Sequence, residues 1–151
     1  MKVIGYLDSE HLFEAYADDF CHVTRSDGGH VRLRATRPGV ASIEDLNEAE
    51  INALGGAIQR LAKAMKTALT TNGVDIRRIN IQYNNNWSDL YRTEPSFCIH
   101  FYGRAYDYIK QPLGQSLYFP SPREHEDFYR GNEPITDEDI NLIRTLLSEM
   151  L

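Results

Sequence analysis

A cysteine and a histidine two residues apart carry the clearest chemical signal in this sequence. Reactive and apolar side chains alternate over residues 97–102, in the order Phe, Cys, Ile, His, Phe, Tyr. A β-strand turns alternate side chains to opposite faces, so Cys98, His100 and Tyr102 would share one face. Cys98 could act as a nucleophile with His100 as its base, because a thiol attacks only after losing its proton. The alternative is a half-buried core strand whose cysteine is a small apolar residue.

An asparagine-rich turn before this strand adds side chains that could bind an anion. It runs Asn84-Asn85-Asn86-Trp87, and Arg92 and Ser96 follow it. A guanidinium binds an anion through paired hydrogen bonds, but equally firm binding of ground state and transition state does not accelerate a reaction. Arg92 is therefore either part of an anion-binding pocket or a solvated loop residue.

The composition limits the class of protein and of partner. A chain of 151 residues with 42% hydrophobic content can form one domain with a substantial core. Its net charge of -6 disfavours non-specific binding to nucleic acid, although a local group of Arg, His and backbone amides can still bind a small anion. No apolar run is long enough to span a membrane and no basic-then-apolar leader is present, which predicts no membrane association and a cytoplasmic location.

The remaining cysteine and histidines do not suggest a disulfide framework or a metal centre. Cys21 and Cys98 are expected to be free thiols, because one cysteine pair is too few to staple a domain of this length. No Cys-x-x-Cys or His-Glu-x-x-His spacing occurs. The other histidines are dispersed along the sequence: His11, His22, His30 and His125. His30, at the start of a strand, is expected to make a hydrogen bond to the backbone. We predict no metal site and no cofactor.

Two elements are predicted to precede the asparagine-rich turn. Residues 20–25 and 30–36 are typical of a β-hairpin, joined by Ser26-Asp27-Gly28-Gly29, whereas residues 1–19 show no clean period. Residues 47–72 carry apolar side chains at three- and four-residue steps, which predicts a long amphipathic helix.

Local capping signals support this long helix and a second one at the C-terminus. Asn47 with Glu50 three residues later predicts the N-terminal cap, and Asn72-Gly73 predicts the end of the helix. Thr136 is expected to cap the C-terminal helix. Between the reactive strand and this helix lies an aromatic tail broken by prolines, which could pack on the domain edge or cover a pocket mouth.

These elements predict a single α+β domain over residues 1–151. Its core is expected over about residues 20–104, with a further strand at 78–83, and the tail and terminal helix over 105–151. We expect a mostly antiparallel sheet of five to six strands, with the 47–72 helix packed on one face.

The element order and several short motifs resemble the histidine triad (HIT) superfamily over about residues 20–104. The matching pieces are Gly28-Gly29-His30-Val31 at the second hairpin strand, Ser42-Ile43-Glu44-Asp45-Leu46 before the helix, and His100-Phe101-Tyr102-Gly103-Arg104 on the reactive strand. The family signature is His-φ-His-φ-His-φ-φ, with an Asn about eleven residues ahead of it. Matching His100 to the third histidine puts Ser96 and Cys98 at the first two positions. The Asn position then falls on Asn85, and a position usually held by Gln falls on Arg92.

The resemblance implies a nucleotide ligand, a purine nucleoside phosphate above all, and a homodimer. In the family the middle histidine attacks the α-phosphate of a nucleotide, and here that position is Cys98. One hypothesis is a nucleotide hydrolase or transferase acting on a nucleoside phosphate, phosphoramidate or dinucleoside polyphosphate, with Cys98 and His100 in an impaired catalytic face. The alternative is a catalytically silent nucleotide-binding or protein-interaction module, whose pocket is formed by Asn85, Arg92, Ser96 and His100.

Overall fold

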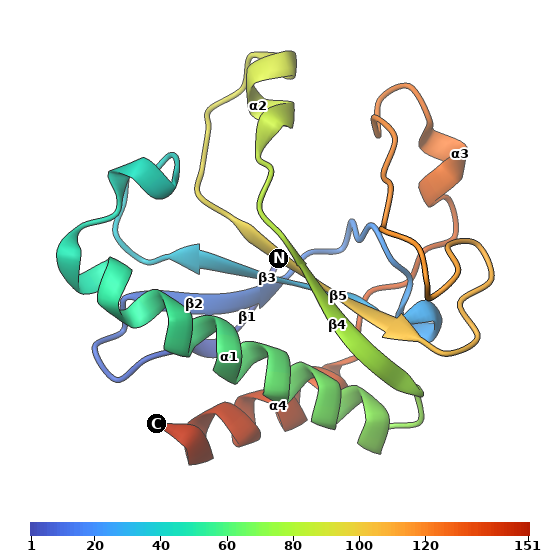
Figure 1. Ribbon diagram of the computed structural model, residues 1–151, viewed down its shortest axis with the longest axis horizontal. Helices are drawn as coiled ribbons and strands as arrows, with labels where there is room; N and C mark the ends of the chain where they lie inside the picture. Colours follow the sequence, from blue (N-terminus) through green and yellow to red (C-terminus); the bar gives the residue numbers. More distant parts are fainter.

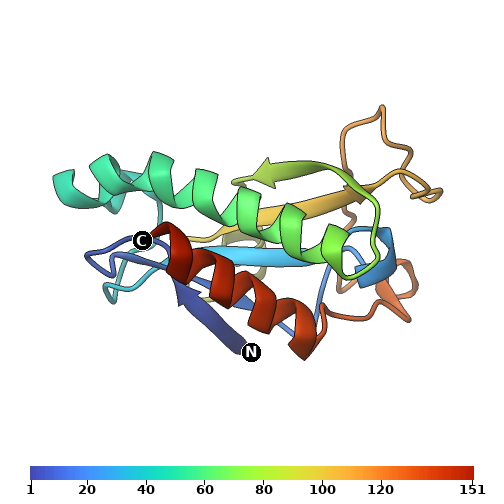
Figure 2. The ribbon, with the colours of Figure 1, turned by 90° about the horizontal axis from the view of Figure 1, so that it is seen from below.

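The computed structural model describes residues 1–151 and has the predicted α+β architecture. One antiparallel sheet of five strands has the order β1-β2-β3-β5-β4. The strands are β1 (Lys2–Tyr6), β2 (Phe13–Ala17), β3 (His30–Ala35), β4 (Ile76–Gln82) and β5 (Ile99–Ala105). The long helices α1 (Glu48–Thr71) and α4 (Asp137–Met150) cover one face of the sheet (Figures 1 and 2). None of the helices is long and apolar enough to cross a membrane.

Two short helices lie on the other side of the sheet from α1 and α4 (Figure 1). These are α2 (Asn86–Tyr91), which interrupts the connection from β4 to β5, and α3 (Glu126–Tyr129) in the aromatic tail. Two single turns of 3-10 helix, η1 (Arg25–Asp27) and η2 (Ile43–Asp45), complete the fold. The side of the sheet without long helices is therefore covered only by loops and short helices.

The predicted hairpin is wrong in its first strand. The strand that pairs with β3 on this side is β2, with Ala15 opposite Leu33, and β1 pairs with β2 in turn. Both β1 and β2 come from the N-terminal region that showed no period, because strands of five residues are too short for alternation to stand out. Residues 20–25 instead bond to the C-terminal loop, where the Asn132 amide donates to the Cys21 carbonyl and Arg25 N–H donates to the Glu133 carbonyl.

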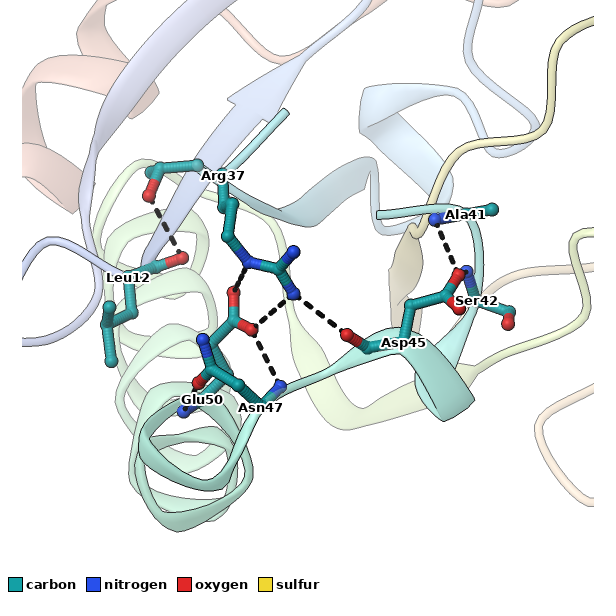
Figure 3. Close-up of polar contacts among 8 residues, drawn as sticks. Leu12, Arg37, Ala41, Ser42, Asp45, Asn47 and Glu50 are labelled. Carbon is teal, nitrogen blue, oxygen red and sulfur yellow. Dashed lines mark hydrogen bonds and ion pairs between the residues drawn. The ribbon is translucent and has the colours of Figure 1, made fainter. Parts of the chain in front are cut away.

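The predicted N-terminal cap of the long helix is confirmed and is tied to the end of β3 by an ion pair. Asn47 accepts from the Glu50 N–H (2.9 Å), and the Glu50 carboxylate accepts from the Asn47 N–H (2.8 Å). Glu50 is buried, and the hydrogen bond from Arg37 (2.8 Å) holds the pKa of its carboxyl below the usual range (Figure 3). The helix ends at Asn72 and Gly73, with Gly73 at φ +100°, as the sequence predicts.

The predicted alternation of the reactive strand is also confirmed. Phe97, Ile99 and Phe101 join the main core beneath α1 and α4. Cys98, His100 and Tyr102 occupy the intervening positions of the strand, and all three line a cleft. The C-terminal helix begins at Thr136, whose side chain accepts from Asp139 N–H as predicted. The apolar residues of the reactive strand thus pack against the helices, and its polar residues line the other face of the sheet.

Candidate functional site

A cleft of about 790 Å³ lies over β3, β4 and β5. Arg32 of β3 and Cys98, His100 and Tyr102 of the β5 segment form its floor, since alternate residues of neighbouring strands share a face. Residues 81–85, with Trp87 and Ser88 of α2, line one side, and residues 117–119 of the aromatic tail line the other. The cleft therefore brings together the reactive strand, the asparagine-rich turn and the tail.

Three histidines gather beside the cleft floor, although the sequence pointed to only one of them. His22, His30 and His100 each place a ring nitrogen within 4.8 Å of the others. His30 begins β3 next to β5, so its place beside His100 follows from the strand pairing. His22 comes from the loop before η1, and the expectation that it is isolated is wrong. Because His30 and Arg32 are two residues apart on one strand, the sequence could have indicated that His30 shares the polar face. Nothing in the sequence around His22 indicates that it belongs to the cluster.

A chain of hydrogen bonds fixes which ring nitrogen carries the proton in His30 and in His100. The His22 backbone N–H donates to His30 Nδ1 (3.1 Å), so His30 must carry its proton on Nε2. From there it donates to His100 Nδ1 (2.9 Å), which leaves the His100 proton on Nε2. His100 therefore offers an N–H donor at Nε2, and its lone pair at Nδ1 is already used.

Burial keeps all three rings neutral. Desolvation lowers the pKa of His22 to about 4 and that of His100 to about 3, and it lowers the pKa of the fully buried His30 well below its ordinary value. The guanidinium of Arg32 lowers each of these pKa values further. A neutral His30 is what the hydrogen-bond chain requires, because an imidazolium has no acceptor nitrogen.

The histidine geometry does not fit a three-histidine metal centre. A histidine that ligates a metal donates a lone pair to the ion and keeps its proton on the other nitrogen. His30 Nδ1 accepts from backbone, so the proton sits on Nε2, the nitrogen directed at His100. No lone pair of His30 is therefore directed into the cluster, which is organised by hydrogen bonds.

Cys98 lines the cleft as a thiol and not as a reactive thiolate. It is 7% exposed, and its Sγ lies 3.5 Å from the Tyr16 hydroxyl. Burial raises the pKa of the Cys98 thiol, and the nearby Tyr16 hydroxyl and Arg32 charge offset this only in part. No hydrogen bond joins Cys98 to His100, so the structure does not bring them together as a nucleophile and its base.

The three residues predicted to bind phosphate have different surroundings. Ser96 is exposed and lines the cleft. Asn85, in a left-handed conformation, also lines the cleft. In the amide orientation that satisfies both of its polar groups, it donates to the Cys98 carbonyl (3.1 Å) and accepts from the Cys98 N–H (3.2 Å). Arg92 is exposed at the end of α2 and does not line the cleft. This agrees with the alternative that Arg92 is a solvated loop residue.

The cation of the cleft is Arg32. Its side chain is 15% exposed, donates to the Phe20 carbonyl (3.1 Å) and lies 3.4 Å from the Asp18 carboxylate. It sits opposite His100 in the pairing of β3 with β5. Arg32 lies between the buried Val31 and Leu33, so the sequence puts it on the polar face of its strand, but only this pairing puts it beside the reactive strand.

Arg104 fixes the tail that forms one side of the cleft. Its buried guanidinium donates to the Gln111, Pro112 and Gln115 carbonyls and to the Asn80 side chain. Hydrogen bonds from a charged donor to buried carbonyls are among the stronger ones in proteins. The tail held in this way packs on the domain through Tyr108 and Leu117, and its residues 117–119 line the cleft.

Comparison with known proteins supports the fold and goes no further. No protein-family model and no curated protein matches the sequence. A histidine triad protein from Sinorhizobium meliloti superposes with a TM-score of 0.62 at 17% identity, covering 99% of this chain and 89% of that one. A Zn-bound histidine triad family protein from Mycobacterium smegmatis gives 0.59 at 19% identity, covering 99% and 87%. A hypothetical histidine triad nucleotide-binding protein from Sulfolobus tokodaii gives 0.57 at 13% identity, covering 99% and 83%. The chain therefore has the fold of the histidine triad proteins.

Proposed function

We propose that this protein binds a nucleotide in the cleft and does not turn it over by a covalent route. The fold is that of proteins of which one, from Sulfolobus tokodaii, is named as nucleotide-binding. The cleft offers a cation and a neutral N–H donor on its floor, from Arg32 and His100, and aromatic side chains on both sides. These groups suit a phosphate and a base respectively.

The observation that carries the proposal is the state of Cys98. Covalent transfer by a cysteine needs the thiolate, and a buried thiol with a raised pKa stays protonated at neutral pH. His100 cannot take the thiol proton through Nδ1, because that nitrogen accepts from His30. Binding groups are thus present without the means of attack.

A nucleotide hydrolase or transferase is the second candidate, and one observation favours it. His100 Nε2–H and the Arg32 guanidinium, on paired residues of β3 and β5, could stabilise charge on a phosphate oxygen. Such electrostatic stabilisation would leave a slow reaction with water as the route to product. The two candidates differ in whether product forms.

Turnover assays separate the candidates. We expect the purified protein to release no product from adenosine phosphoramidate or a dinucleoside polyphosphate above the uncatalysed rate, since the nucleophile is missing. A Cys98→His variant, if folded, is expected to gain activity because an imidazole attacks without prior deprotonation. Product would be followed by chromatography over hours.

The second buried free cysteine, Cys21, provides the control. Cys98→Ala and Cys21→Ala should both leave the absence of turnover unchanged. Turnover by the natural protein that is abolished in Cys98→Ala but kept in Cys21→Ala would refute the silent-module proposal and establish Cys98 as the nucleophile.

We further propose a cytoplasmic homodimer that joins through β4 and α1. β4 is an edge strand with Ile81 43% exposed, and α1 carries Ile51 49% exposed. An edge strand with unpaired backbone groups can extend its sheet into a second copy. Sedimentation velocity at micromolar concentration should give a dimer, shifted toward monomer in an Ile81→Lys variant; a monomer in the natural protein would refute this arrangement.

A further inference from the structure

We propose that helix α2 is a movable side of the cleft, and that its last residue, Tyr91, latches it to the aromatic tail on the opposite side. Release of this latch opens the cleft for a ligand to enter or leave. The latch follows from contacts within the protein alone. Only its effect on ligand exchange rests on the proposed nucleotide binding.

The side chain of Tyr91 joins the two segments that line opposite sides of the cleft. Its hydroxyl shares a hydrogen bond with the Ser121 hydroxyl, and the Arg123 guanidinium lies over its ring, with Cζ 3.9 Å from the ring centroid. On α2, Trp87 stacks on the same ring (5.7 Å between centroids) and lines the cleft. On the tail, residues 117–119 line the cleft shortly before Ser121. The contacts of Tyr91 with Ser121 and Arg123 form what we call the latch.

Apart from the latch, α2 has few ties to the rest of the protein. None of its six residues is buried. Its other hydrogen bonds all stay within residues 84–93. Tyr91 is therefore the one residue of α2 whose side chain forms a hydrogen bond to another segment. Segments with little buried surface and exposed backbone hydrogen bonds open at a low cost in free energy.

The backbone conformation at both ends of α2 is suited to a hinge. Asn85 and Arg92 have φ of +52° and +56°, and they are two of only three non-glycine residues in the chain with positive φ. Hinges are a few residues at the ends of elements that absorb changes in φ and ψ. The Asn85 amide, bonded to the backbone of Cys98, fixes the first end. Residues 92–96 after the second end are all exposed, so that end is the one free to swing.

The tail on the opposite side is held by buried groups and stays in place. The buried Tyr129 hydroxyl donates to the Pro120 carbonyl (2.5 Å), next to Ser121. The buried Gln111 side chain accepts from the Tyr118 N–H (2.7 Å), and Arg104 holds the carbonyls farther back in the tail. Opening therefore moves α2 away from a fixed tail.

Fluorescence of Trp87 tests the latch without any ligand. It is the only tryptophan of the chain and lies on α2, so acrylamide quenching reports the exposure of this helix alone. A double variant, Ser121→Ala with Arg123→Gln, removes the latch from the tail side and leaves the stacking of Trp87 on Tyr91 unaltered. We expect its quenching constant to rise above that of the natural protein. Tyr91→Phe, which keeps the ring and loses only the hydroxyl, should give a smaller rise.

Arg77 provides the matched control. Its guanidinium lies over the Tyr106 ring at 4.8 Å, and neither residue lines the cleft. Arg77→Gln therefore removes a similar contact of the tail and should leave the quenching unchanged. Circular dichroism would establish that each variant is folded. Quenching in the double variant equal to that of the natural protein would overturn the latch.

Ligand exchange tests whether the movement of α2 controls access. In stopped-flow mixing with adenosine phosphoramidate, we expect the association and dissociation rate constants of the double variant both to rise about tenfold, because a hydrogen bond and a cation–π contact together shift an equilibrium by about that factor. The dissociation constant should change less than either rate constant. Unchanged rate constants beside increased quenching would overturn the control of access. Failure of the natural protein to bind would refute the proposed function, whereas the quenching alone decides the latch.

Discussion

Replacing Gly103 by alanine is expected to cost at least about 3 kcal/mol of folding stability, a large part of what a domain of this size possesses. A Cβ at Gly103 would lie 2.0 Å from the Gly28 carbonyl oxygen, and a Cβ at Gly28 would lie 1.8 Å from the Gly103 carbonyl oxygen. Both obstacles are backbone atoms, which cannot rotate away as a side-chain end can. The turn before β3 and the strand β5 therefore approach too closely for any side chain.

The functional consequence concerns the histidine cluster. The same turn leads into His30. A hydrogen bond from the Gly103 N–H to the Gly29 carbonyl (3.1 Å) holds the turn against β5. If the Gly103→Ala protein folds at all, the turn must move away from β5, and the 2.9 Å contact between His30 and His100 should weaken with it. We expect nucleotide affinity to fall together with stability.

Urea denaturation of Gly103→Ala beside Gly55→Ala checks this prediction. Gly55 lies inside α1, and a methyl group added there would have no atom within 4 Å, so alanine should stabilise the helix by about 0.5–1 kcal/mol. The two variants thus make the same chemical change with opposite expected signs. A Gly103→Ala protein within about 1 kcal/mol of the natural one would show that the two backbones are not in contact.

Features encoded by neighbouring residues were predictable from the sequence. The cap of α1 depends on Asn47 and Glu50, three residues apart, and the two faces of the reactive strand depend on alternation within six residues. The cap of α4 at Thr136 is equally local. Each of these needs no knowledge of what lies across the fold, which is why the predictions hold.

Features that depend on pairing between distant segments were not predictable. His22 reaches the cluster only because residues 20–25 bond to the loop near Asn132, more than a hundred positions away. Arg32 reaches the cleft because β3 pairs with β5. Arg92 became a candidate because the resemblance puts it at a family position ahead of the reactive strand, yet the structure leaves it exposed at the end of α2. Closeness in sequence did not identify the residues of the site, because the pairing of the strands decides which residues line the cleft.

Acid is expected to unfold this protein before its carboxylates titrate. In the unfolded chain a histidine has a pKa of about 6.5, whereas in the folded protein burial lowers the pKa of His22 to about 4 and of His100 to about 3, with His30 lowered as well. Between these values the unfolded state binds more protons. The stability that the three neutral histidines contribute is therefore fully present above about pH 6.5. It is lost as the pH falls below this value, by up to about 1.4 kcal/mol per pH unit for each histidine.

Urea midpoints measured from pH 8 to pH 4.5 test this loss, in a window above the pKa of most carboxyl groups. The pKa values of Glu50 and Asp139 are lowered, so their contributions are lost only at more acidic pH. His30→Gln should flatten the slope by about one histidine's share, whereas His125→Gln, at an exposed position, should leave it unchanged. Stability that stays constant from pH 7 to pH 5 would show that the folded cluster accepts protons freely, and the neutral hydrogen-bond chain through His30 would then be wrong.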